Sequence, residues 1–507
     1  MKRITNLFVL CSLLMAPLRA QERIMVIADP HVFPQALIAQ EADFDAYMSK
    51  QRKMVDLSEP IWNALMDTVL AVQPALVLIP GDLTRDGEAG SHALVSQSLQ
   101  ALRAQGIPSL VIPGNHDLPD ANWESLYFGA EDVYIKDPAS HSFAAEPLPG
   151  VTVLGIDGAH GNAGIGSLSA STLAWLLAQA DSAQAKGNMI IAMCHWQLMD
   201  HFDMQGQLEA SCQLKDAAAV RDSLMHHGVH LVLTGHFHVN SITTWRDTTG
   251  LTNDSIVEIS TGSPITYPCP YRWLTLSEDR LNVQVETDYL TSLDSISDLT
   301  TYSREWMAVH TENMIPTLAL RAWQKVDNNW SLVESKMATI GLDYLAPTLK
   351  NLLPKTDSAR IDLVQRHLGQ AAINLYLFHS EANENERPEV GQVLANSVYQ
   401  GMENMMKEMF GLFADMLPFF VNYAIVMAEE PVQSLVEDIT YRSSALYADR
   451  TDDLRLTLRI NAPHWPEAIE PVRRSGEDNT IYDILGRPVS RPAQHGVYIQ
   501  NGQKIIR

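Results

Sequence analysis

The strongest constraint on the fold of this chain is an alternation of short apolar runs with stretches of helical spacing. The runs are rich in Val, Ile and Leu and apolar on both faces, as expected of strands that helices cover. They are Ile24–Ala28, Ala75–Ile79, Ser109–Ile112, Val151–Ile156, Met189–Met193 and Val229–Leu233. The stretches between them include Glu59–Val72, Ser91–Ala104, Ser169–Gln184 and Leu214–His227. This alternation predicts an α/β domain.

Beyond Val239 the pattern changes and predicts three further parts. Strand runs between turn residues add antiparallel strands to the α/β domain, at Ile256–Ser260, Arg272–Leu276 and Leu281–Glu286. Helical spacing follows at Arg304–Val326, Ser331–Gly341, Ile361–Phe378 and Gln392–Val426. Strand runs return at Ile481–Ile484 and Val497–Ile499, and Asn501-Gly502 before Gln503–Ile506 is a hairpin signal. We therefore expect an α/β domain at 21–290, a helical domain at 291–453 and a small β tail at 454–507.

The first twenty residues have the pattern of a secretory signal peptide. Lys2 and Arg3 precede an apolar run from Leu7 to Leu14, and the small residue Ala20 suits a cleavage site. The run is too short to span a bilayer, and a buried N-terminal helix is the alternative. The pattern predicts an exported chain, located in the periplasm, at the cell surface or outside the cell.

The charge of the chain limits its partners. It has 36 Lys and Arg residues against 60 Asp and Glu residues, a formal net charge of −24. Such a chain repels polyanions, so we expect no bulk binding to nucleic acid or anionic membrane. One strongly apolar stretch, Met409–Met427, is interrupted by Asp415 and Pro418. It predicts a helical core rather than a membrane span, and a lid that contacts lipid or substrate is the alternative.

Polar residues that can bind metal ions follow five of the strand runs. In chain order they are Asp29 and His31, Asp82, Asn115 with His116 and Asp117, His195, and His236 with His238. Because the carboxyl ends of strands in an α/β sheet share one edge, we expect these groups to converge. Each motif alone is a weak signal, but five in this order are hard to explain by coincidence.

The chemistry of this set favours two divalent ions. Carboxylate, amide oxygen and imidazole suit hard or borderline ions such as Mn, Fe, Zn or Ca. Two ions about 3.5–4 Å apart clamp a phosphoryl group and activate a water molecule. Asp82 can bridge them because its carboxylate has two oxygens. We expect Gly81, Gly114 and Gly235 to let the backbone turn sharply beside these residues.

These residues resemble a known signature. Asp29-Pro30-His31, Gly81-Asp82, Gly114-Asn115-His116-Asp117, His195 and Gly235-His236-Phe237-His238 together look like the complete set of the calcineurin-like metallophosphoesterases. The resemblance covers roughly Arg23 to Thr287 and implies a four-layer α-β-β-α sandwich. It implies that Asp29, His31 and His238 bind one metal ion. It also implies that Asn115, His195 and His236 bind the other, and that Asp82 bridges.

The same resemblance gives His116 a role in catalysis. It implies that His116 binds no metal, stabilises the transition state and protonates the leaving alkoxide. Asp117 or Asp86 orients it, and a capping role is the other reading of Asp117. Arg85 is either a phosphate-binding residue or part of a surface salt bridge.

Two weaker likenesses refine this picture. Purple acid phosphatases carry a tyrosine ligand shortly after the bridging Asp, where this chain has Leu83-Thr84-Arg85, which disfavours an Fe(III)–tyrosinate centre. The stretch Gly81–Thr84 is more similar to bacterial phosphodiesterase-like members. The tail, at 481–489 and 496–499, resembles C-terminal sorting domains of type IX secretion, and a plain β hairpin is the alternative.

We expect an exported enzyme that hydrolyses a small phosphomonoester or phosphodiester. A metal-bound hydroxide attacks phosphorus and His116 assists the leaving group. The alternative is an exported surface or periplasmic binding protein with a non-catalytic domain of this kind. The complete ligand set and the presence of His116 argue against that alternative.

Overall fold

The structure is a computed structural model of the chain. It describes residues 22–119, 122–129, 134–159, 164–201, 205, 210–247, 254–339, 341–382, 388–411, 455–459, 482–483, 497–500 and 503–506. The predicted signal peptide at 1–20 and the turn at Asn501-Gly502 lie outside these ranges.

The first sheet has six strands in the order β13-β12-β11-β1-β2-β3. Their bounds are β1 (Glu22–Val26), β2 (Leu76–Pro80), β3 (Ser109–Ile112), β11 (Pro270–Leu276), β12 (Asn282–Tyr289) and β13 (Arg455–Arg459). The strands β1, β2 and β3 run parallel, and the other neighbours are antiparallel. The carboxyl ends of three parallel strands therefore point to the same edge.

The second sheet has seven strands in the order β4-β5-β6-β7-β8-β10-β9. Their bounds are β4 (Tyr134–Lys136), β5 (Phe143–Leu148), β6 (Val151–Ile156), β7 (Met189–Cys194), β8 (Leu231–Thr234), β9 (Ser241–Arg246) and β10 (Ser255–Ser260). The strands β6, β7, β8 and β10 are parallel, and β4, β5 and β9 pair antiparallel with their neighbours.

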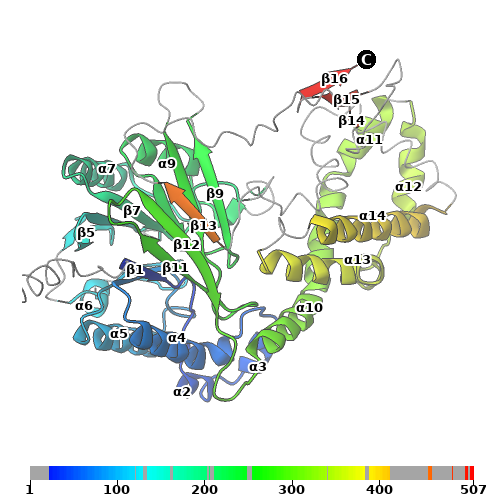
Figure 1. The fold of residues 1–507 in the computed structure, drawn as a ribbon. Helices are drawn as coiled ribbons and strands as arrows, with labels where there is room; N and C mark the ends of the chain where they lie inside the picture. Colours follow the sequence, from blue (N-terminus) through cyan, green and yellow to red (C-terminus); the bar gives the residue numbers. More distant parts are fainter. Residues whose placement is uncertain are drawn as a thin grey trace, which may run out of the picture. The chain divides into compact units, whose positions relative to one another are not determined.

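The helices of this part of the chain cover the outer faces of the two sheets (Figure 1). They are α2 (Gln35–Ile38), α3 (Phe44–Met48), η1 (Val55–Leu57), α4 (Ser58–Val72), α5 (Ala89–Ala104), α6 (Trp123–Tyr127), α7 (Ala170–Ala185), η2 (Ala210–Cys212) and α9 (Ala217–His226). Side chains of α4 and α5 pack against the first sheet, and those of α7 and α9 pack against the second.

The alternation of side chains along β7 defines the layers. Its odd-numbered residues, from Met189 to Met193, lie in the core shared with the first sheet. Its even-numbered residues, from Ile190 to Cys194, lie in the core shared with α7 and α9. Because successive side chains of a strand point to opposite faces, the second sheet lies between the first sheet and these helices. The predicted four-layer α-β-β-α sandwich is confirmed.

A helical region follows the sandwich, as predicted. Its elements are α10 (Leu299–Asn328), α11 (Trp330–Thr339), η3 (Asp343–Leu345), α12 (Ala346–Leu352), α13 (Asp357–Ser380) and α14 (Pro388–Phe410). Met405, Met406 and Met409 of α14 pack against a cluster that contains Trp323 and Phe410. The remainder of the stretch 409–427 lies beyond the described residues from position 412 onward. Within the described ranges, no helix combines the length and apolar character needed to cross a bilayer.

The last strands form a separate unit. The strands β14 (Tyr482–Asp483), β15 (Val497–Gln500) and β16 (Gln503–Ile506) make a small antiparallel sheet within the unit 462–507. The pairing of Gln500 with Gln503 agrees with the predicted hairpin. The strand β13 instead pairs with β12 at the edge of the first sheet. The exact domain boundaries stay predictions.

Candidate metal centre

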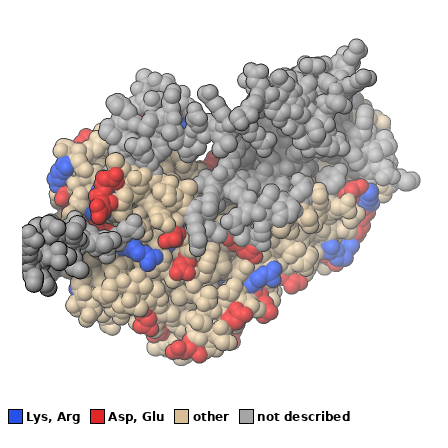
Figure 2. All heavy atoms as spheres, in the orientation of Figure 1, with Lys and Arg blue, Asp and Glu red and all other residues tan. Residues whose placement is uncertain are grey.

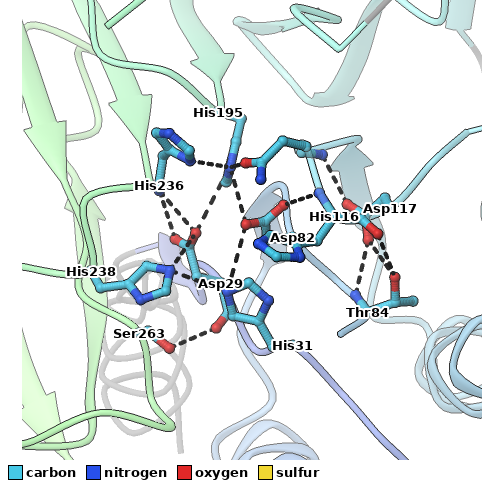
Figure 3. A network of polar contacts seen from close by, with 12 residues as sticks. Asp29, His31, Asp82, Thr84, His116, Asp117, His195, His236, His238 and Ser263 are labelled. Carbon is cyan, nitrogen blue, oxygen red and sulfur yellow. Dashed lines mark hydrogen bonds and ion pairs between the residues drawn. The ribbon is translucent and has the colours of Figure 1, made fainter. Parts of the chain in front are cut away.

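Loops that follow β1, β2, β3, β7 and β8 bring the predicted site residues together (Figure 3). Asp29, Asp82 and His195 are fully buried or nearly so. The strands β1, β2 and β3 are parallel within the first sheet, and β7 and β8 are parallel within the second. The site therefore combines loops from the carboxyl edges of two sheets, not from one edge of a single sheet as the sequence suggested.

The first group of possible ligands consists of Asp29, His31, Asp82 and His238, whose ligand atoms all lie within 4.8 Å of one another. Nε2 of His31 and Nε2 of His238 are 3.1 Å apart, and Nε2 of His238 is 3.3 Å from Oδ1 of Asp29. Oδ2 of Asp82 is 3.5 Å from Nε2 of His31. Atoms that bind one ion at ~2.1 Å lie about 3.0–3.4 Å apart, so this group has the spacing of a metal site.

The second group shares Asp82 with the first and adds His195 and His236. Nε2 of His195 is 3.3 Å from Oδ2 of Asp82 and 3.1 Å from Nδ1 of His236. Oδ1 of Asn115 is also 3.1 Å from Nε2 of His195. Nδ1 of His195 lies 2.9 Å from the Pro80 carbonyl oxygen and donates to it, which leaves Nε2 available as a ligand atom.

The donor set therefore fits two divalent ions. Asp82 is the residue common to both groups, as a bridging ligand must be. Asp29 and Asp82 are buried carboxylates, and buried charges are stable only when they are paired or bind metal ions. The individual ligand roles stay predictions, but the structure brings all seven predicted ligands into one cluster.

Backbone conformation gives a second sign that the site is functional. Five of the predicted ligands have φ in the left-handed region: Asp29 (53°), His31 (40°), Asp82 (51°), His236 (65°) and His238 (62°). This conformation costs L-residues roughly 1–2 kcal/mol each. Such outliers concentrate at functional sites, where the surrounding structure holds them in place.

Two of the three glycines have a steric role in addition to the expected one. Gly81 has a φ of 97°, as a sharp turn requires, but Gly114 and Gly235 have no left-handed φ. A Cβ atom on Gly114 would lie 2.2 Å from Oδ1 of Asp82, and one on Gly235 would lie 2.2 Å from Oδ2 of Asp29. These two glycines leave room for the carboxylates. The chain also turns at both, since the N–H of Phe237 donates to the Gly235 carbonyl oxygen at 2.7 Å and that of Asp117 to the Gly114 carbonyl oxygen at 3.4 Å, but glycine is needed there for space and not for a left-handed φ.

Replacing Gly235 by alanine should therefore weaken metal binding although it removes no ligand. The new methyl group displaces the Asp29 carboxylate, and we expect a loss of about 10–100-fold in metal affinity, as for other partners that orient ligands. Isothermal titration with Mn²⁺ or Zn²⁺ measures this. Gly90→Ala in α5 is the matched control, because its Cβ would approach only the Leu37 side chain, at 3.2 Å. Equal affinities in the wild-type chain and Gly235→Ala would contradict the steric role.

Burial and neighbouring charges set the ionisation of the histidines in the absence of metal. Burial lowers the pKa of His195, but the charges of Asp82 and Asp29 and hydrogen bonds to Asp82 and Pro80 raise it to about 9. Burial and the charge of His195 lower the pKa of His236 to about 3. His195 is thus the proton-bearing ring of this pair, and a cation at its Nε2 competes with that proton.

The structure distinguishes between the two candidates for orienting His116. Nδ1 of His116 is 2.7 Å from Oδ1 of Asp86. Asp117 instead accepts from the backbone N–H groups of Thr84 and Gly114, at 2.9 and 2.8 Å, and so ties two site loops together. Burial and the charge of Asp82 raise the pKa of Asp117 to about 6. Asp86 is therefore the orienting residue.

Arg85 follows the salt-bridge reading rather than the phosphate-binding one. Its guanidinium pairs with Glu41 at 2.5 Å and with Glu88 at 2.8 Å, and it lies 3.8 Å from the centre of the Phe33 ring. With these partners Arg85 supports the loop that carries Asp86.

Two further residues belong to the site and had no signal in the sequence. Oγ of Ser263 donates to the carbonyl oxygen of Asp29 at 2.7 Å (Figure 3). Lys53 is the second: burial lowers the pKa of its ammonium group, and the charges of Asp82, Asp86 and Asp29 oppose this effect. Both residues lie in loops without periodicity, and neither has a recognisable spacing from the ligands.

The last turns of α13 contact segments that flank the site. The ring of His379 lies 5.5 Å from that of Phe237, which separates the two histidine ligands in the sequence. The hydroxyl of Tyr267 donates to Glu381 at 2.8 Å, and Arg52 lies over the Tyr376 ring at 4.5 Å. The end of α13 is thus a neighbour of the candidate centre.

Residues 22–240 match the model of the calcineurin-like phosphoesterase family, and they form a domain of this kind. Among solved structures, the chain is similar to a dimetal phosphatase from Danio rerio, with 15% identity, a TM-score of 0.39, and coverage of 52% of this chain and 95% of that chain. It is also similar to a purple acid phosphatase from yellow lupin (Lupinus luteus) seeds, with 12% identity, a TM-score of 0.34, and coverage of 55% and 53%. No curated protein sequence gives a significant match.

Proposed function

We propose that this chain is a metal-dependent hydrolase of small phosphomonoesters or phosphodiesters. The observation that carries the proposal is the convergence of two ligand groups on Asp82, with an oriented histidine beside them. The family match over residues 22–240 supports the same class of reaction.

The ions would be held by the two groups described above, and Mn, Fe, Zn and Ca all suit such ligands. When bound, they would supply Lewis-acid activation of water and of the phosphoryl oxygens. The chain itself fixes the geometry of its ligands. The backbone N–H of His116 donates to Oδ1 of Asp82 at 2.9 Å, and that of His236 donates to both oxygens of Asp29, at 2.9 and 3.0 Å.

His116 is suited to protonate the leaving group. Its Nδ1–H donates to Asp86, so the proton available for transfer is the one on Nε2. Burial would raise the pKa of Asp86, but the hydrogen bond and charge of His116 lower it overall, which keeps the acceptor ionised. His116 retains 30% of its side-chain exposure, and its ring centre is 4.9 Å from that of His31. A substrate beside the ligands can therefore reach it.

Metal removal and reconstitution test the proposal. The stripped chain should hydrolyse neither a nitrophenyl monoester nor a bis-nitrophenyl diester, and adding back Mn, Zn, Fe or Ca singly should restore activity with at least one ion. At an ion concentration 100 times Kd, binding should add about 2.7 kcal/mol to the free energy of unfolding, which thermal melts detect. The ratio of the two activities assigns the substrate class.

The alternative, a binding protein with a non-catalytic domain, gives a different result. Such a protein would bind the ions and gain stability but would hydrolyse neither ester. That outcome would contradict the proposed function.

We also propose that the chain is exported, on the basis of its first twenty residues. Mass spectrometry of the chain recovered after expression in a Gram-negative host should find Gln21 as the first residue. An intact Met1 would contradict export through this segment.

A further inference from the structure

Lys53 lies in a segment that is linked to the metal centre by hydrogen bonds. The segment joins α3 to η1, and Met54 and Val55 next to it are fully buried. The backbone N–H of Met54 donates to the carbonyl oxygen of Ile265 at 2.8 Å. Two residues before Ile265, Ser263 donates to the carbonyl oxygen of Asp29 at 2.7 Å. The backbone at Lys53 is therefore fixed relative to a predicted ligand.

The charges around Lys53 are those of the site. Burial lowers its pKa, and Asp82, Asp86 and Asp29, in that order, are the acidic groups that oppose this effect. After burial, the cation of Lys53 is the next largest cause that lowers the pKa of His31. The ammonium group therefore lies within electrostatic range of both ligand groups and of the residue that orients His116.

Lys53 and the neighbouring Arg52 differ in their contacts. The guanidinium of Arg52 lies over the Tyr376 ring of α13. The side chain of Lys53 is partly buried, and within the described residues it has no hydrogen bond or ion pair. Three carboxylates attract it without any of them forming a direct contact.

Binding of ions changes the charge that Lys53 faces. Two bound divalent cations would exceed the charge of the Asp29 and Asp82 carboxylates, so the filled centre would be positive. A lysine held beside a positive centre requires an anion as its partner. Lysine is a common point-charge partner of phosphate. The phosphoryl group of a phosphoester substrate is such an anion.

We propose that Lys53 binds a non-bridging oxygen of the substrate's phosphoryl group and thereby favours dianionic monoesters over monoanionic diesters. This inference rests on the proposed function and specifies its substrate class. A dianion interacts more strongly than a monoanion with a fixed cation at the same distance. Lys53 is then a substrate-binding residue that lies outside the five sequence motifs of the site.

The test compares Lys53→Met, which keeps the apolar stem, with Lys53→Arg, which keeps the charge. Lys50→Met is the matched control, because Lys50 is an exposed lysine three residues earlier. For metal-loaded proteins, titration calorimetry measures the affinity for inorganic phosphate. Loss of a charge-assisted hydrogen bond should weaken phosphate binding by about 10–100-fold in Lys53→Met. Lys53→Arg should recover part of that loss, and Lys50→Met should equal the wild-type chain.

Three further measurements distinguish the possible outcomes. Metal affinity measured on the same proteins should be unchanged or higher in Lys53→Met, because a cation has been removed. The value of kcat/KM should fall more for a nitrophenyl monoester than for the diester. Phosphate affinity within twofold of wild type in Lys53→Met, or in a Lys53→Gln variant should the first not fold, would overturn the inference. Lysine-dependent phosphate binding by a wild-type chain that hydrolyses neither ester would instead contradict the proposed function alone.

Discussion

Replacing Asp82 by alanine should abolish turnover and prevent the chain from holding two ions. Asp82 is common to both ligand groups, so its removal takes a possible ligand from each. We expect metal affinity to fall by more than the ~10–100-fold loss that is typical of outer partners of a ligand. Metal content after dialysis and initial rates on both nitrophenyl esters measure the two effects.

The controls for this variant separate charge from shape. Asp82→Asn keeps the size of the side chain but removes its charge, so it should retain the fold and still lose at least one ion. Asp67→Ala changes an exposed carboxylate on α4 and should behave like the wild-type chain. A fully loaded and active Asp82→Ala protein would show that Asp82 does not bridge the ions.

Replacing His116 by alanine should lower turnover by about 10²–10⁴-fold while both ions stay bound. The bond that His116 makes to Oδ1 of Asp82 comes from its backbone N–H, so the substitution leaves that bond in place. The lost group is the Nε2 proton donor. Metal content and kcat, measured on the same preparation, test both halves of this prediction.

The dependence on the leaving group identifies the role of His116. Nitrophenolate leaves without protonation, whereas an alkoxide needs a proton, so the His116→Ala defect should be larger for an alkyl ester than for a nitrophenyl ester. Asp86→Asn should show a smaller defect with the same dependence, because Asp86 only orients the imidazole. Equal defects on both esters, or loss of an ion, would refute proton donation by His116.

The parts of the fold that sequence predicted best are the buried parallel strands. β3 and β6 coincide with the apolar runs Ser109–Ile112 and Val151–Ile156, because every residue of these strands is buried. The strand β9, Ser241–Arg246, was not predicted, since only its first two residues are buried and the others are partly or fully exposed. The short edge strand β4 is likewise largely exposed. Mostly exposed strands with few apolar residues give neither a continuous apolar run nor a clear alternation of apolar and polar residues.

In the site, too, the residues placed by buried parallel strands were predicted, and those placed by loops were not. Its predicted ligands come directly after parallel strands, so chain order and chemistry were enough to group them. The choice of Asp86 over Asp117, and the positions of Ser263 and Lys53, depend on the paths of loops. Loop paths are set by tertiary hydrogen bonds such as Met54 to Ile265, which no local pattern encodes. The steric role of Gly114 and Gly235 likewise requires knowledge of neighbours that are distant in the sequence.

The pairing of β13 with β12 has a consequence for how this chain can diversify. The chain leaves the first sheet at Tyr289 and returns to it at Arg455, in the adjacent antiparallel position. In topological terms, the whole helical region is an insertion into the loop of a β hairpin. Insertions at such a place leave strand order and register unaltered, because their two ends emerge side by side. Related chains can therefore exchange, shorten or enlarge this segment without changing the strand order of the sandwich.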